Sequence, residues 1–236
     1  MVSVGLIIAD ASLEAVPEQI LTHPSVRNHA LRIGKKPTEL LLDQSYHHSA
    51  MIAHRLEHIW KRGRPDLVHF ALVAALATPL YLKNKLDVYV YTTSRKVILI
   101  DDSVRFPKSY FRFEGLMMKL FKDQVVRSPI DNRKLLEVID DVSFDYFMKD
   151  IVCASKSIGL SSHGIPTSAQ DLVSKNIDVS SDCLCAIVIG GFPKGRFSNE
   201  ISNFLGSLHS IANLTLEAHV VISRVLYECE KIFSIS

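Results

Sequence analysis

Short apolar runs alternate with segments of helical periodicity along this chain of 236 residues. Ile151–Ala154 and Leu184–Ile189 are continuous apolar runs, which is typical of strands covered on both faces, and Ser3–Ala9 is a short β-branched run that indicates a core strand. In the segments between such runs, apolar residues recur at helical spacing. Because strands that alternate with helices pair in parallel, the pattern predicts an α/β fold with a mostly parallel sheet.

The remaining boundaries follow from the same patterns. We predict helices over 12–21, 46–62, 67–77, 110–121, 168–173 and 211–233, strands over 38–42, 86–92, 96–101 and 151–154, and surface loops over 22–37 and 125–133; residues 135–139 are a short apolar segment that we assign to neither class. Thr93-Ser94-Arg95 links two strand-like runs, which indicates a β-hairpin inserted into the core fold. The apolar segment Leu67–Leu82 contains His69 and Pro79 and is shorter than a membrane span, so we expect a buried helix there.

Composition limits the classes of partner. The net charge of +2 is too small for a protein that binds nucleic acid over its whole surface, so any such contact must come from local basic patches. The four cysteines have neither CxxC spacing nor histidine neighbours at zinc-site spacing, so we expect no metal. The chain opens on a strand-like run instead of a signal peptide, and we expect a cytoplasmic protein with no membrane contact.

The first basic cluster is the turn Lys61-Arg62-Gly63-Arg64-Pro65-Asp66, which leads directly into an apolar run. Pro65 fixes its own φ and favours extended backbone at Arg64. Arginine suits bidentate recognition of phosphate, and a nearby aspartate such as Asp66 can hold the guanidinium in one orientation. The alternative is a solvated turn capped by Asp66.

A second basic cluster interleaves cations with aromatic residues. Arg105, Lys108 and Arg112 are spaced by three and then four, and Phe106, Tyr110, Phe111 and Phe113 lie between and beside them. Bases of unpaired RNA stack on aromatic rings while cations hold the phosphates, so this pattern is typical of RNA binding. If the helix begins near Pro107, Lys108 and Arg112 share one face. The alternative is an amphipathic helix whose aromatic residues are core and whose cations are solvated.

The remaining polar motifs are less specific. Ile187–Ile189 runs into the glycine-rich turn Gly190–Gly195, and ligands of open α/β sheets bind outside such strand ends. The turn departs from phosphate-binding motifs, because Arg196 and Phe197 replace their Lys and Ser/Thr. The adjacent Ser162 and His163 do not by themselves form a nucleophilic pair, and His47 and His48 are packed or solvated more often than metal-bound.

Taken in order, these motifs resemble the pseudouridine N1-specific methyltransferases of ribosome biogenesis, the nucleolar essential protein family and its archaeal relatives. The matching pieces are Leu42-Asp43-Gln44-Ser45-Tyr46-His47-His48, Arg62-Gly63-Arg64-Pro65-Asp66-Leu67-Val68-His69, Arg105-Phe106-Pro107-Lys108-Ser109-Tyr110-Phe111-Arg112-Phe113 and Ile189–Gly195. They extend over most of the chain. The chain differs from the family in two segments. The last loop lacks the usual proline and contains Glu217, and Lys108 stands where relatives often have arginine.

The resemblance implies a SPOUT-type domain over residues 1–236, with a deep C-terminal trefoil knot, a β-rich extension at about 84–104 and a homodimer. Chain physics alone would not predict the knot, since knots are almost absent from proteins. The implied cofactor is S-adenosylmethionine, held by three loops. By position, its binding residues are Ser161, Gly190, Gly195, Ile211, Ala212, Asn213, Leu214, Thr215 and Leu216.

The function implied is methylation of N1 of a pseudouridine in small-subunit ribosomal RNA. The RNA-contacting residues would be Arg64, Arg105, Lys108 and Arg112, with Asp66 orienting Arg64. The sequence identifies no catalytic base. The alternative is a non-catalytic rRNA-binding assembly factor, which the altered loop from Ile211 to Leu216 keeps open.

Overall fold

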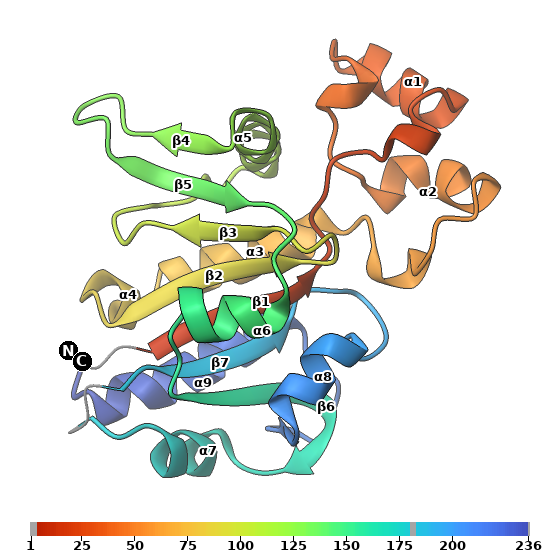
Figure 1. Ribbon diagram of the computed structural model, residues 1–236. Helices are drawn as coiled ribbons and strands as arrows, with labels where there is room; N and C mark the ends of the chain where they lie inside the picture. The colour runs from red at the N-terminus through yellow and green to blue at the C-terminus, as the bar shows by residue number, and fades with distance from the viewer. Residues whose placement is uncertain (1–3, 180–182, 236) are drawn as a thin grey trace.

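A computed structural model describes residues 4–179 and 183–235, and in this part of the chain one mixed sheet organises the fold (Figure 1). Its eight strands are β1 (Val4–Ala11), β2 (Leu86–Thr92), β3 (Val97–Ile100), β4 (Val125–Arg127), β5 (Lys134–Ile139), β6 (Lys156–Pro166), β7 (Cys185–Gly190) and β8 (Leu208–Ser210). They lie in the order β4-β5-β3-β2-β1-β7-β6-β8. Five neighbouring strands, in the order β2-β1-β7-β6-β8, pair in parallel. The strands β3, β5 and β4 continue the sheet beyond β2 with antiparallel pairing.

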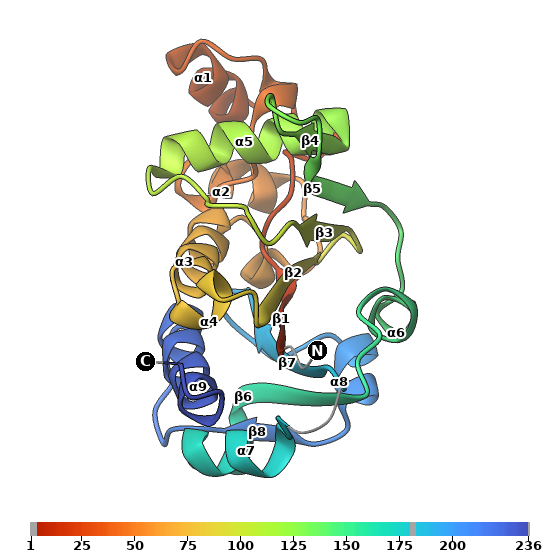
Figure 2. The same ribbon diagram turned by 90° about the vertical axis from the view of Figure 1, so that its left-hand side faces the viewer.

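Helices cover both faces of this sheet. The α-helices of the described part of the chain are α1 (Pro24–Arg32), α2 (Gln44–Ala53), α3 (Pro65–Leu76), α4 (Pro79–Leu82), α5 (Tyr110–Asp123), α6 (Phe144–Tyr146), α7 (Ala169–Asn176), α8 (Asn199–Leu205) and α9 (Ala218–Ile232). In edge-on view α3, α4 and α9 lie on one side of the sheet and α6 and α8 on the other (Figure 2). None of the helices in the described part of the chain is long and apolar enough to cross a membrane.

Side chains of β1 point alternately to the two faces of the sheet and so contribute to two apolar cores, one on each face. Leu6 and Ile8 pack with α3, α5 and α9, while Ile7 and Ala9 pack with α6 and α8. Successive side chains of a strand point to opposite faces, so a strand buried on both faces is largely apolar; all eight residues of β1 are buried, and Asp10 is the charged residue among them. The predicted α/β class and mostly parallel sheet are therefore confirmed, as is the antiparallel pairing of β2 with β3. Ser3, the predicted start of the first strand, lies outside the described residues.

The region before α3 contradicts the sequence prediction. Residues 12–21 form no α-helix, because Pro17 lacks a backbone donor and favours extended backbone before it; only a 3-10 turn, Glu18–Ile20, follows. The predicted loop 22–37 instead contains α1, which starts at Pro24 and is capped by the His23 side chain. The strand predicted over 38–42 is absent: Thr38 and Glu39 belong to a 3-10 turn, Pro37–Glu39, and Leu41 forms an isolated bridge to Ala15. The helix predicted over 46–62 ends at Ala53.

These segments pack around a core of their own. Val16, Ile20, Val26, Leu40 and Met51 are among the buried residues of a third apolar cluster, separate from the two sheet cores. Figure 1 shows α1 and α2 standing beyond the carboxyl end of β1, away from the main sheet. The chain therefore carries a small helical unit, residues 12–61, which periodicity alone did not reveal.

Three further boundaries differ from prediction. The strand expected at 151–154 is absent: a π-helical turn, Phe147–Ile151, occupies its start and Cys153 has φ +54°, outside the strand region. The actual strand, β6, begins at Lys156. Within the predicted loop 125–133, Val125–Arg127 forms β4. The last helix begins at Ala218, seven residues later than predicted, because Ile211–Glu217 is a loop.

Candidate functional site

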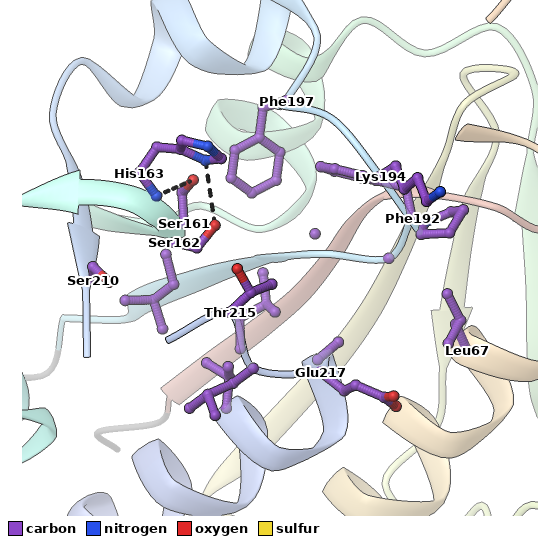
Figure 3. Close-up of a pocket in the computed structure, with 18 of the residues that line it drawn as sticks. Leu67, Ser161, Ser162, His163, Phe192, Lys194, Phe197, Ser210, Thr215 and Glu217 are labelled. Atoms are coloured by element: carbon purple, nitrogen blue, oxygen red, sulfur yellow. Dashed lines mark hydrogen bonds between the residues drawn. The ribbon is translucent and has the colours of Figure 1, made fainter. Parts of the chain in front are cut away.

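A pocket of about 470 Å³ lies outside the carboxyl ends of β7 and β8, where open α/β sheets bind ligands (Figure 3). Three segments of the C-terminal half contribute most of its wall: residues 160–163 of β6, residues 189–197 after β7, and residues 209–221 after β8. Arg64 and Leu67, from the start of α3, complete its rim. The site therefore joins the last strands of the sheet to the first basic cluster.

The segment Ser161–Gly164 leaves the sheet and returns to it. Leu160 and Ile165 both lie opposite His209 in β8, so the four residues between them have no partner there. A Cβ on Gly164 would lie 2.5 Å from the carbonyl carbon of His209, so only glycine allows the return. In the excursion the backbone N–H of His163 donates to Ser161 Oγ at 3.3 Å. Ser161–Gly164 therefore form a bulge within β6.

The loop after β7 is fixed by close backbone contacts. The N–H of Gly191 donates to the carbonyl of Ala9, and the Ser12 N–H donates to the carbonyl of Gly191, each at 2.8 Å. A Cβ on Gly190 would lie only 2.7 Å from the ring of Phe192, which lines the pocket. Gly195 adopts φ +102°, a conformation that favours glycine. These glycines therefore set the shape of the wall.

The loop after β8 supplies the apolar side of the pocket. Ile211, Leu214 and Leu216 line it, and the Ser210 hydroxyl donates to the Ala212 carbonyl at 2.7 Å. Of the nine predicted cofactor residues, the pocket brings together Ser161, Gly190, Gly195, Ile211, Ala212, Leu214, Thr215 and Leu216. Asn213 is in the same loop but does not line the pocket.

The three cations of the first basic cluster differ in their surroundings. Lys61 pairs with Asp10 at 2.8 Å, and Arg62 forms a two-point contact with Glu14 at 2.6 and 2.7 Å; both carboxylates are buried. These acidic partners lie about 50 residues earlier in the chain, so local sequence gave no sign of them. Two of the three cations are therefore paired with buried carboxylates inside the fold.

Arg64 is the cation of this cluster that reaches the pocket. Its guanidinium makes two hydrogen bonds of 2.8 Å to Asp66, which together raise its pKa, and its side chain remains about one third exposed. Its backbone N–H donates to Ser12 Oγ at 2.8 Å, which fixes the chain just before α3. The predicted geometry, a guanidinium oriented by Asp66, is present.

The second basic cluster is only partly as predicted. Arg105, Lys108 and Arg112 are exposed, and none forms an ion pair with a described residue. However, α5 begins at Tyr110, so Lys108 precedes the helix and does not share a helical face with Arg112. Of the four predicted aromatic residues, Phe106 and Phe113 are core, Tyr110 is half-buried, and Phe111 is 64% exposed.

His69 attaches this cluster to α3. Its Nε2 lies 2.7 Å from the Pro107 carbonyl, which makes Nε2–H the donor, and its ring stacks on Phe113 at 4.5 Å between centroids. Sequence reasoning noted His69 only as a polar residue in an apolar helix. The contact places the turn carrying Arg105 and Lys108 against the helix that begins at Arg64.

The two adjacent histidines have different surroundings. His47 is fully buried and accepts a hydrogen bond from the Asp43 N–H at Nδ1, so its Nε2–H donates to His29 Nδ1 at 2.9 Å. His48 is exposed. Within the described residues no group of three His, Cys, Asp or Glu side chains could hold a metal ion. The packed interpretation of His47 is therefore correct.

Comparisons with known proteins agree with this architecture. The family described as EMG1/NEP1 methyltransferase matches residues 6–230. Proteins named ribosomal RNA small subunit methyltransferase Nep1 are similar over almost their whole length: that of Thermococcus sibiricus is 38% identical over 232 residues, 95% of this chain and 96% of the relative. The Pyrococcus furiosus protein is 34% identical over 238 residues, covering 96% and 97%.

A solved structure of a relative has the same fold. The crystal structure of Archaeoglobus fulgidus Nep1 bound to S-adenosylhomocysteine is 35% identical, covers 99% of this chain and 100% of its own, and superposes with a TM-score of 0.83. A family match over nearly the whole length, full-length relatives above 30% identity and a shared fold lead to one conclusion. The chain belongs to the EMG1/NEP1 methyltransferase family.

Proposed function

We propose that this protein uses S-adenosylmethionine to methylate N1 of a pseudouridine in small-subunit ribosomal RNA during ribosome biogenesis. The observation that carries the proposal is the pocket at the end of β7 and β8, with the Asp66-held guanidinium of Arg64 at its rim. A pocket of suitable size for the cofactor and a cation suited to RNA therefore lie at one place, in a member of a family described as methyltransferases.

The pocket suits the proposed cofactor. Its volume of about 470 Å³ falls within the range of small-molecule sites, and it combines the apolar side chains of Ile211, Leu214 and Leu216 with exposed backbone. Ser161, Gly190, Gly195, Ala212 and Thr215 would complete the binding wall, and Asn213 would act only through the backbone of its loop. When bound, S-adenosylmethionine supplies a methyl group that its sulfonium centre already activates.

The residues of the chain then have a limited task. Arg64 would hold the RNA at the rim so that the acceptor nitrogen is in line with the pocket, and Arg105, Lys108 and Arg112 would hold neighbouring phosphates. Asp66 would orient Arg64. The target base would have to leave its stack to enter the pocket. The apolar wall would exclude water from the reacting atoms.

Two measurements test the proposal together. Calorimetric titration should show S-adenosylmethionine binding at one site per chain, and a stem-loop carrying pseudouridine should gain a methyl group when a matched uridine stem-loop does not. Binding of RNA without any cofactor binding would instead support the non-catalytic assembly factor. Methylation of both stem-loops would contradict the specificity for pseudouridine N1.

Replacing Arg64 by alanine should weaken RNA binding by about 1 kcal/mol, roughly fivefold, and leave cofactor binding unchanged. Lys108→Ala should cost less, because an exposed ammonium is not held in place as the Arg64 guanidinium is. Asp66→Ala should reproduce part of the Arg64 loss. The measurement is an RNA titration of each variant, with Lys83→Ala as the control, since Lys83 is an exposed cation at the end of α4. Equal RNA affinity of Arg64→Ala and wild type would remove Arg64 from the interface.

We also propose that residues 1–236 form a single SPOUT domain whose C-terminal part is a deep trefoil knot, with 84–104 as an inserted extension. Support comes from the family match over residues 6–230, from the unpaired excursion of β6 beside β8, and from α9, which packs back against α3. A cytoplasmic location is consistent with a ribosomal RNA substrate.

A homodimer is the expected assembly. Phe70 on α3 and Tyr227 on α9 remain 51% and 58% exposed, and a second copy related by twofold symmetry would cover such residues. Sedimentation at micromolar concentration should therefore give twice the mass of one chain. A monomer under these conditions would contradict the proposed assembly but not the methyl transfer, which the calorimetric and methylation assays test separately.

A further inference from the structure

A second hollow, of about 460 Å³, lies on the outer face of the helical unit, away from the cofactor pocket. It is formed by α1 and the turn that follows it, and its lining residues are Thr22, Pro24, Arg27, Asn28, Ala30, Leu31, Lys35 and Pro37. Leu31 is 81% exposed although it is a large apolar residue. The hollow thus combines an apolar surface with two cations and an amide, which are the groups that recognise a nucleotide.

The chain segment that forms this hollow is rich in cations. From residue 19 to residue 38 the chain contains Arg27, Arg32, Lys35 and Lys36 and no aspartate or glutamate. None of these four cations forms an ion pair with a residue in the described part of the chain. Lys61 and Arg62, by contrast, are already paired inside the fold. Arg27, Lys35 and Lys36 therefore remain available for an anionic partner, whereas Arg32 lies over the ring of Tyr46 at 4.9 Å.

The hollow is continuous with the second basic cluster. The ammonium of Lys35 lies 5.6 Å from the ring centroid of Phe111, the exposed aromatic residue of α5, and Arg112 follows Phe111 directly. Lys35 thus belongs both to the hollow and to the surface that carries Arg112. A polynucleotide held at Arg112 would therefore pass close to Lys35 and the hollow.

We infer that this hollow binds an unstacked nucleotide of the same RNA, distant from the methylated base; the inference rests on the proposed function. Arg27 and Lys35 hold its phosphates, and the face of the base packs on Leu31 and the neighbouring proline rings. Asn28 is exposed and has no side-chain partner among the described residues, so its amide is free to pair with a base edge. The helical unit is therefore a second RNA-binding site, and it determines which RNA binds with its target base at the pocket.

An abasic scan of the RNA tests this inference. Nucleotides of the stem-loop and its flanks are replaced one at a time by abasic residues, and each RNA is titrated against wild type, Asn28→Leu and Arg27→Ala. One position other than the target should weaken binding to wild type about tenfold when its base is removed. The same removal should have no effect on Asn28→Leu. Arg27→Ala should also flatten the dependence of log affinity on log salt by about 0.7, the value for one phosphate of a single strand.

Controls separate this result from the proposed function. Lys83→Ala removes an equally exposed cation and should keep the wild-type abasic profile. S-adenosylhomocysteine affinity should be identical in wild type, Asn28→Leu, Arg27→Ala and Lys83→Ala, which also shows that these variants are folded. If no abasic position distinguishes wild type from Asn28→Leu while Arg64→Ala still weakens RNA binding, the hollow is not a nucleotide site. If Arg64→Ala is also without effect, the RNA interface itself is wrong.

Discussion

Replacement of Gly190 by valine is expected to lower the affinity for S-adenosylmethionine at least about tenfold, or roughly 1.4 kcal/mol, in a protein that still folds. The cause is indirect. A Cβ at this position would lie 2.7 Å from the ring of Phe192, so the ring must turn, and this ring lines the pocket beneath the Lys61 ammonium, 4.7 Å away. Titration calorimetry with the cofactor and with S-adenosylhomocysteine measures the loss.

Gly115→Ala is the matched control for this variant. An added Cβ at Gly115 meets nothing within 4 Å, and its position inside α5 favours alanine over glycine. The control should bind cofactor like wild type and be slightly more stable. Unchanged cofactor affinity in a folded Gly190→Val protein would show that the loop after β7 does not contact the cofactor.

Acid should destabilise the protein through His47 before most carboxylates are protonated. Burial, with a smaller contribution from His29, lowers the pKa of His47 to about 4, against about 6.5 for a histidine in an unfolded chain. Between these two values the unfolded chain binds more protons than the folded one, so stability falls as pH falls. The free energy of unfolding should therefore drop by on the order of 3 kcal/mol from pH 6.5 to pH 4 on account of this residue.

Denaturant unfolding at a series of pH values checks this expectation. His47→Asn keeps an acceptor for the Asp43 N–H but removes the titration, so the variant is less stable at neutral pH and its stability depends less on pH. His48→Asn, one residue away on the exposed side of α2, should retain the wild-type pH dependence. The assignment fails if His47→Asn and wild type lose the same free energy over this range.

Some features of the site were readable from short stretches of sequence. Arg64 and Asp66 are two residues apart, and Pro65 between them limits the backbone, so their pairing depends on local geometry. The continuous apolar runs of β1 and β7 likewise follow from burial on both faces, which is the same wherever such a strand lies in a sheet. The loops that line the pocket were predicted from their resemblance to a family, not from their composition.

Other features depended on residues that are distant in sequence. The buried carboxylates Asp10 and Glu14 convert Lys61 and Arg62 from apparent ligands of an anion into internal ties. The bond from His69 to the Pro107 carbonyl joins two basic clusters that are separated by about 40 residues. No local pattern encodes such pairings, because each depends on which elements the fold brings together.

The sequence by itself determined the α/β class, the buried strands and the Arg64–Asp66 pair, because periodicity and short-range sterics act within a few residues. Only the tertiary structure decided that residues 12–61 form a separate helical unit, that Ser161–Gly164 leaves and rejoins β6, and which cations stay unpaired. The physical reason is that packing and charge pairing are set by distance in space, whereas helix and strand patterns are set by distance along the chain.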